Sequence, residues 1–286
     1  MSRGVSTVLD AALFLLLVSA AATTLAAPHG TPPAPDAEPS ATVVSRVSVS
    51  VNYSLAPGAA GAPERFPRVG ETFDRHAHGR LAGLLARGAV RNTTVGGTEL
   101  ARTSDGYERA VAAAVANATG TRTRVLTVWQ PYEGADVGGR LAAGPEPPRD
   151  ASVASRVLRV ETAAGGARAR ALAAANRSGY AGVARVLANA TTRVLFPREG
   201  MTNALAADYP TDRLAARRYA RADRLFGADT TAAIERGDAA AANERLRRAL
   251  REGYERRVRA AFDSPAAAAR AVRAGEVRIV VRRWSA

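Results

Sequence analysis

The segment that most constrains this chain is an apolar run close to its beginning. Residues 5–27 (VSTVLDAALFLLLVSAAATTLAA) contain a single charged residue, Asp10. At helical rise this run would span roughly 34 Å, which exceeds a bilayer core of about 30 Å. We therefore expect residues 1–27 to form a transmembrane helix or a signal segment. Arg3 precedes the run and the next arginine is Arg46, so the positive-inside rule places the N-terminus in the cytoplasm and the rest of the chain outside.

Three fates of this segment are compatible with its residues. A cleavable secretory signal fits the basic start and the small residues at 20–22 and 24–26, which are typical of a cleavage site. An uncleaved signal anchor fits the length of the run, because signal h-regions usually have only about 7–15 residues. In the third, a short basic peptide ending at Gly4 is removed and the apolar helix is kept. The three predict a secreted protein, an anchored protein and a pilin-like protein.

The stretch RGVSTVLD at residues 3–10 resembles the start of archaeal type IV pilin-like proteins, whose leaders commonly read RGVSPV. It also resembles Tad-type pseudopilins, in which an acidic residue lies early in the helix. More broadly, the chain looks like an uncharacterised family of haloarchaeal single-pass exported proteins. The resemblance implies processing at Arg3, Gly4 and Val5, and pairing of Asp10 with the freed amine of Val5 on a neighbouring subunit. The alternative is that Asp10 reaches interfacial water, which would lower the cost of an ionised group in an apolar helix.

The amino-acid composition excludes some kinds of site and indicates the charge of possible partners. The 286 residues contain no cysteine, which excludes disulfides, thiolate nucleophiles and cysteine-ligated metals. The sequence also lacks lysine, so all 40 basic residues are arginine and the formal net charge is +14. Such a surplus suits anionic lipid, acidic surfaces or nucleic acid, although a merely solvated basic surface is the alternative. We do not expect nucleic acid, because the few aromatic residues are scattered and offer no stacking platform.

Hydrophobic periodicity predicts an α+β protein. After a proline-rich linker over 28–41, residues 42–286 are expected to form a mixed, helix-rich domain with a small sheet of about four strands. A proline- and glycine-rich loop over 130–150 could divide this domain. The expected strands are 47–55, 122–129, 153–161 and 277–282. The expected helices are 73–89, 107–117, 167–194 with an interruption at Gly179 and Gly182, 214–226, one from Asp238, and a last one from Ser264 and Pro265.

Candidate sites are few. Five of seven asparagines lie in N-x-Ser/Thr sequons, where chance would give about one, and this excess favours export and N-glycosylation. The five are Asn52, Asn92, Asn117, Asn176 and Asn189. The helix after Asp238 carries a candidate basic interaction face formed by Arg247, Arg248, Arg251 and Arg256.

A metal site at Asp74, His76 and His78 is weighed and set aside, because residues two apart diverge on the expected helix. We identify no catalytic residue, no metal ligand and no cofactor. The sequence therefore predicts a membrane-tethered extracytoplasmic structural or interaction protein, an accessory of a pilus-like or cell-envelope assembly. Expected partners are the membrane, pilus-like or envelope proteins, or an acidic glycan. The alternative is a secreted hydrolase or glycan-binding module without a known motif, and the oligomeric state stays open.

Overall fold

The structure is a computed structural model that describes residues 34–56, 73–101 and 105–285. Arg3, Gly4, Val5 and Asp10, and with them the leader over 1–27, lie outside the described residues. None of the helices within the described ranges combines the length and the apolar character needed to cross a membrane.

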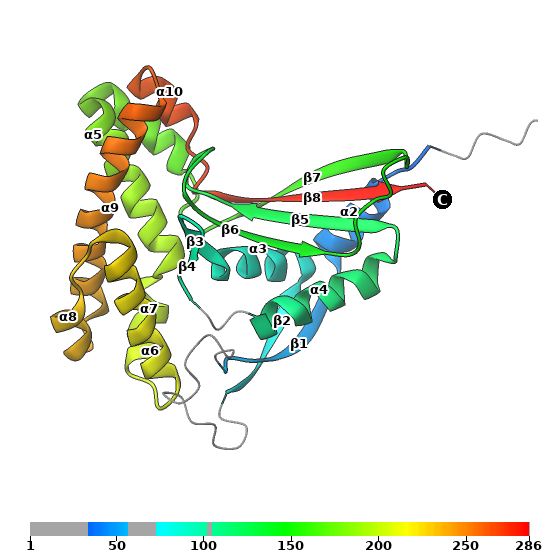
Figure 1. Cartoon of the computed structure of the whole chain (residues 1–286), viewed down its shortest axis with the longest axis horizontal. Coiled ribbons are helices and arrows are strands. Elements are labelled where there is room, and N and C mark those ends of the chain that lie inside the picture. Colours follow the sequence, from blue (N-terminus) through cyan, green and yellow to red (C-terminus); the bar gives the residue numbers. More distant parts are fainter. Residues whose placement is uncertain (1–33, 57–72, 102–104, 286) are drawn as a thin grey trace, which may run out of the picture.

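The described residues form a mixed helix and sheet structure (Figure 1). The helices are α2 (Glu38–Arg46), α3 (Leu81–Arg91), α4 (Asp105–Thr119), α5 (Ala167–Leu195), α6 (Arg198–Leu205), α7 (Thr211–Phe226), α8 (Thr231–Glu235), α9 (Ala239–Ala261) and α10 (Pro265–Arg270). The strands are β1 (Ser48–Ser54), β2 (Asp74–Arg80), β3 (Thr93–Val95), β4 (Thr98–Glu99), β5 (Thr123–Trp129), β6 (Val137–Ala143), β7 (Val153–Glu161) and β8 (Glu276–Trp284).

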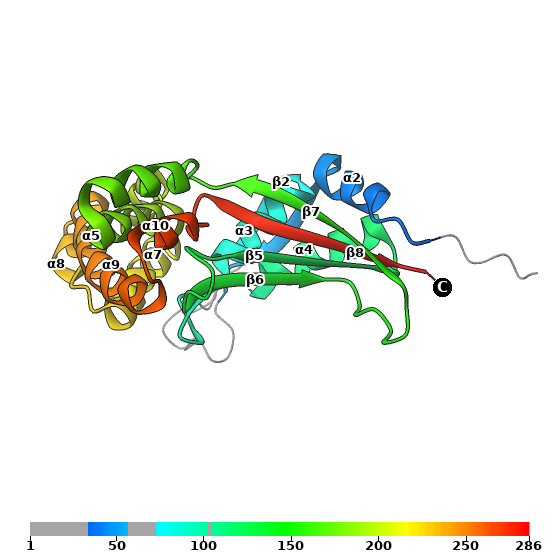
Figure 2. The same cartoon turned by 90° about the horizontal axis from the view of Figure 1, so that it is seen from above.

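The strands form two sheets. Strands β1 and β2 pair with each other, and the other six form an antiparallel sheet in the order β4-β3-β6-β5-β8-β7. Helices α2, α3 and α4 lie against one face of the larger sheet, whereas helices α5 to α10 gather at one end of it (Figures 1 and 2). Within the described residues, the other face of the larger sheet has no helical cover (Figure 2). The C-terminal end of β8 lies near α2, at the end of the sheet away from helices α5 to α10 (Figure 1).

The alternation of side chains along the central strands explains why one face is covered. On β5, Thr123, Val125, Thr127 and Trp129 are buried and the residues between them are partly exposed. Successive side chains point to opposite faces of a sheet, so this pattern puts one apolar face against α3. Gly139 of β6 lets this helix approach closely, because a Cβ at that position would lie 1.8 Å from the carbonyl oxygen of Ala89.

Local sequence also accounts for the long helices α5 and α9, which lie at one end of the larger sheet. Helix α9 buries Leu246, Leu250, Tyr254 and Val258, the stripe that four-residue spacing predicts. Helix α5 is kinked at Ser178 and Gly179, where the glycine adopts a φ of 57°, a conformation that side chains with a Cβ disfavour.

The N-terminal ends predicted for α9 and α10 are confirmed. The side chain of Ser264 accepts a hydrogen bond from the amide of Ala267 at the start of α10. Asp238 caps α9 in the same manner through the amide of Ala241. Because each cap partners an amide that lacks a helical acceptor, the two helices begin where the sequence places them.

The strands predicted over 47–55, 122–129, 153–161 and 277–282 are confirmed as β1, β5, β7 and β8, and the α+β class holds. Several details are wrong. The predicted helix over 73–89 is a strand up to Arg80, because this segment pairs with β1 along its whole length. The predicted loop over 130–150 contains β6, which pairs with β3 and β5. The linker prediction fails from Glu38, where α2 begins with Pro39 in its first turn.

The estimate of about four strands is also too low, since two sheets of two and six strands are present in the described part of the chain. The sequence reading likewise missed α6 and α8. Both helices have eight residues or fewer, too short for a hydrophobic period to stand out.

Candidate functional site

The predicted site residues fall on different parts of the surface. Asn52 lies on the exposed face of β1, opposite His76 of β2. Asn117, Asn176 and Asn189 are exposed on helices α4 and α5. Asn92 differs, because its amide nitrogen donates hydrogen bonds to Glu108 at 3.1 Å and to the carbonyl oxygen of Arg140 at 2.8 Å. A glycan on that nitrogen would remove a donor from this contact, so Asn92 is the sequon least suited to modification in the folded chain.

The structure brings part of the predicted basic face next to one sequon. Arg247, Arg248 and Arg251 of α9 line a cavity of about 200 Å³ together with Asn189 and Arg185 of α5. Arg247 is bonded to Glu244, and this hydrogen bond and charge hold the pKa of Glu244 below its usual value. Arg256 is exposed but does not line this cavity. Three of the four predicted arginines therefore line one cavity, and Arg256 lies outside it.

The histidines also lie differently from the sequence-based expectation. His76 and His78 belong to strand β2, so residues two apart share one exposed face rather than diverging. Nδ1 of His78 lies 3.0 Å from Oγ of Ser50 on the neighbouring strand. Among the described residues, no cluster of three or more His, Asp or Glu side chains could hold a metal ion.

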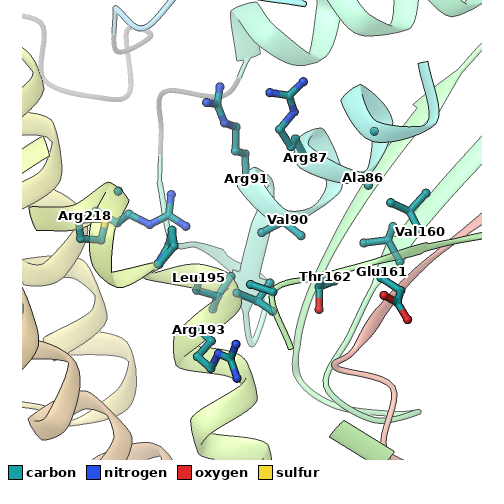
Figure 3. Close-up of a pocket in the computed structure, with 17 residues that line it drawn as sticks. Ala86, Arg87, Val90, Arg91, Val160, Glu161, Thr162, Arg193, Leu195 and Arg218 are labelled. Atoms are coloured by element: carbon teal, nitrogen blue, oxygen red, sulfur yellow. The ribbon is translucent and has the colours of Figure 1, made fainter. Parts of the chain in front are cut away.

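Another cavity among the described residues was missed by the sequence reasoning. We call it the arginine cleft: a cavity of about 590 Å³ bounded by α3, the end of β7, the α5–α6 junction and α7. Figure 3 shows arginine side chains of three helices around this region. They are Arg87 and Arg91 of α3, Arg193 of α5 and Arg218 of α7. A volume of this size is typical of small-ligand sites.

Apolar side chains form the remaining wall of the arginine cleft. Val90, Val160 and Leu195 line it (Figure 3), and Met201 of α6 is also among the lining residues. Of the described residues that line the cleft, only Glu161 carries a carboxylate, and no ion pair joins it to the four arginines. The cleft therefore combines an apolar wall with an excess of positive charge.

Arg91 is held in place by aromatic rings. Its guanidinium lies 4.6 Å from the ring centre of Tyr107 and 5.5 Å from that of Tyr53. It also donates a hydrogen bond of 3.3 Å to the hydroxyl of Tyr53. These contacts fix the charge at the cleft without neutralising it, since an aromatic face attracts a cation but carries no net charge.

Arg218 is the exceptional residue of the cleft. Its Nε is buried and has no hydrogen-bond partner among the described residues. Burial, together with the nearby charge of Arg91, lowers the pKa of Arg218 to about 10. The guanidinium lies 5.3 Å from the ring centre of Phe196, again a contact without opposite charge. Among the described residues, this partly desolvated cation therefore has no anionic partner.

A buried polar network determines where Arg218 lies. The hydroxyl of Tyr219, the next residue on α7, donates to Oδ1 of Asn243 at 2.9 Å, and the amide of Asn243 donates to the carbonyl oxygen of Phe196 at 3.0 Å. Burial raises the pKa of Tyr219, so this hydroxyl stays neutral and keeps donating. The network ties α7 to α9 and to the α5–α6 junction and so orients the cleft-facing side of α7.

No pattern in the sequence marks these four arginines among the 40 in the chain. Arg87 and Arg91 have helical spacing, but Arg193 and Arg218 come from other helices and meet them only through the tertiary fold.

Comparison with known proteins supplies a family but no activity. The model of a family of unknown function, DUF7284, matches residues 9–284, so the chain belongs to that family. No curated protein and no solved structure matches it. Any functional statement must therefore come from the residues and the geometry.

Proposed function

We propose that this member of the DUF7284 family is a membrane-tethered extracytoplasmic binding protein whose arginine cleft holds an anionic amphiphile, a molecule with an apolar body and one acidic head group. One observation carries the proposal: the buried, unpartnered Nε of Arg218 beside a second arginine in an apolar cavity. Unsatisfied buried donors of a charged group are costly and are rarely kept without a use. Carboxylate, sulfonate or phosphate oxygens would accept from this guanidinium and offset the positive charge that it shares with Arg91.

The apolar wall supports an amphiphile over a simple inorganic anion. A small ion would satisfy the arginines but leave the partly exposed Val90, Val160 and Val194 facing water in the remaining space. A ligand with an apolar body would bury these side chains as well. Among the described lining residues Glu161 is the one carboxylate, so they offer no pair of carboxyl groups for acid–base hydrolysis. The geometry therefore favours binding over the hydrolase alternative.

The test is a pair of soluble probes that differ only in charge. Naphthalene-1-sulfonate should bind the full chain in calorimetric titration, and the neutral naphthalene-1-sulfonamide should bind more weakly. Arg218→Met keeps the length of the side chain and removes its charge. We expect it to weaken sulfonate binding about tenfold or more, because hydrogen bonds to charged groups contribute roughly 1.5–3 kcal/mol. The same variant should gain about 1 kcal/mol of stability against urea, since an uncompensated buried charge is removed.

Arg224→Met is the matched control, because Arg224 is exposed on the same helix and does not line the cleft. It should leave the affinity for sulfonate unchanged. The proposal is contradicted if Arg218→Met and Arg224→Met weaken sulfonate binding equally. It is also contradicted if Arg218→Met weakens sulfonamide binding as much as sulfonate binding.

The tether and the pilus-like or envelope context are separate parts of the proposal. They rest on the apolar run over residues 5–27, the RGVSTVLD stretch and the excess of sequons. Mass spectrometry of the mature N-terminus tests them. A start at Val5 supports pilin-like processing and an intact start at Met1 or Ser2 supports a signal anchor. A start near Thr23 or Ala27 contradicts the tether, because the apolar run would be removed.

A further inference from the structure

The helix-free face of the six-stranded sheet carries an ordered pattern of side chains. The register places Val157, Val280, Leu126 and Ala142 opposite one another on β7, β8, β5 and β6. Cross-strand partners lie on the same face, so these four residues form one apolar row that runs across the strands. Val157 is 37% exposed, which is high for a large aliphatic side chain in a sheet.

Arginines flank this apolar row on both sides. Two positions along the strands in one direction, Arg159 pairs with Arg278, and Val128 stands between Arg278 and Arg140. Two positions in the other direction, Arg282 lies opposite Arg124. Arg159 contacts Glu276 at 3.5 Å and Arg124 contacts Glu146 at 3.2 Å. Within the described ranges, Arg140, Arg278 and Arg282 have no ion pair, so the face carries a surplus of positive charge.

The spacing of the rows matches a helix. Two residues along a strand cover about 7 Å, so the two arginine rows lie roughly 14 Å apart. An α-helix with its side chains is about 10–12 Å wide. Four strands at about 4.8 Å spacing give an apolar row of roughly 14 Å, the length of about ten helical residues. A helix laid along the row would place its lower side on the apolar residues and both flanks beside arginines.

We propose that this face, which we call the Arg–Val–Arg face, binds an acidic amphipathic helix of a partner protein. Charge complementarity determines the occupant: the helix must have an apolar stripe with carboxylates on both sides. The segments of this chain outside the described residues do not fit. Residues 5–27 contain one carboxylate, and residues 57–72 contain two carboxylates balanced by two arginines. A second copy fits poorly as well, because the exposed side of α9 is rich in arginine.

Two synthetic helical peptides test the proposal on the full chain. One has leucine at every third and fourth position with glutamate on both sides, and the other has the same composition in shuffled order. Fluorescence anisotropy should show that the patterned peptide binds at least about tenfold more tightly than the shuffled one. Arg278→Glu with Arg282→Glu should reduce that affinity about tenfold or more, because both rows then repel the carboxylates.

The control is Arg248→Glu with Arg256→Glu, which makes the same change in net charge at exposed positions of α9. This variant should bind the patterned peptide as the unchanged chain does. If the double variant on β8 does not fold, Val157→Glu at the exposed edge position introduces one repulsive charge on the row and should also weaken binding.

Three results would overturn the inference. The first is equal affinity for the two peptides, and the second is no binding of either peptide. The third is that the unchanged chain does not distinguish the peptides but binds phosphatidylglycerol vesicles, and that the β8 variant loses this vesicle binding. The last result would assign the face to a lipid surface. The inference does not depend on the arginine cleft, since the two sites lie on opposite faces of the sheet and share none of the mutated residues.

Discussion

The sheet half (α2 to α4 with β1 to β8) and the helical half (α5 to α10) differ in the contacts that join their elements, although the buried hydroxyl of Tyr107 also joins α4 to α3 in the sheet half. In the sheet half, backbone approaches backbone through glycine: a Cβ on Gly144 would lie 2.1 Å from the carbonyl oxygen of Thr123, and Gly139 meets Ala89 more closely still. In the helical half, buried hydroxyls and an amide join the helices. Oγ1 of Thr191 lies 2.9 Å from the hydroxyl of Tyr254, and Tyr219 bonds Asn243 at 2.9 Å.

This difference shows what each half tolerates. Close backbone contacts accept no added atom but need no particular functional group. Buried hydrogen bonds accept small shifts but fail when one partner is lost. The arginine cleft lies between the two halves, with α3 on one side and α6 and α7 on the other. Its geometry therefore depends on both kinds of packing.

The largest expected effect is on the sheet half. Gly139→Ala adds a single Cβ against the carbonyl oxygen of Ala89, and we expect a loss of at least about 3 kcal/mol in the free energy of unfolding. Urea denaturation followed by circular dichroism measures it. A loss below 1 kcal/mol would show that α3 can move away from the sheet, and the contrast between the halves would fail.

The second effect is on the helical half. Asn243→Leu leaves the hydroxyl of Tyr219 and the carbonyl oxygen of Phe196 without their partner, and should cost about 2–3 kcal/mol. It should also weaken sulfonate binding, because Tyr219 adjoins Arg218. Asn203→Leu is the control, since Asn203 is exposed on α6. Similar stability of the two variants would mean that the polar network does not hold this half together.

The smallest expected effect is an increase in the free energy of unfolding. Gly83 lies within α3 and lines the arginine cleft, and a Cβ there would meet no atom within 4 Å. Gly83→Ala should add about 0.5–1 kcal/mol through helix propensity. Gly83→Leu should instead fill the cleft and abolish binding of both naphthalene probes. Unchanged binding in Gly83→Leu would place the probes elsewhere, whatever the stability.

The two halves also differ in how well sequence predicts them. The stripe from Leu246 to Val258, the break near Gly179 and the cap at Ser264 are local patterns, and the helical half follows them. In the sheet half, residues 74–80 and 137–143 have no clear strand pattern of their own. They are strands because β1, β3 and β5 supply their hydrogen-bond partners. Strand formation depends on distant residues, whereas a helix bonds within itself.

The sequence by itself determined the longer helices α5, α7 and α9 of the helical half, the four strands with regular alternation, the absence of cysteine chemistry and the excess of arginine. Only the tertiary structure decided which of the 40 arginines act together. It places Arg91 near Arg218 in the arginine cleft and pairs Arg278 with Arg159 on the Arg–Val–Arg face. The physical reason is that charge is a property of composition, whereas an electrostatic field in a site depends on distances between residues far apart in the chain.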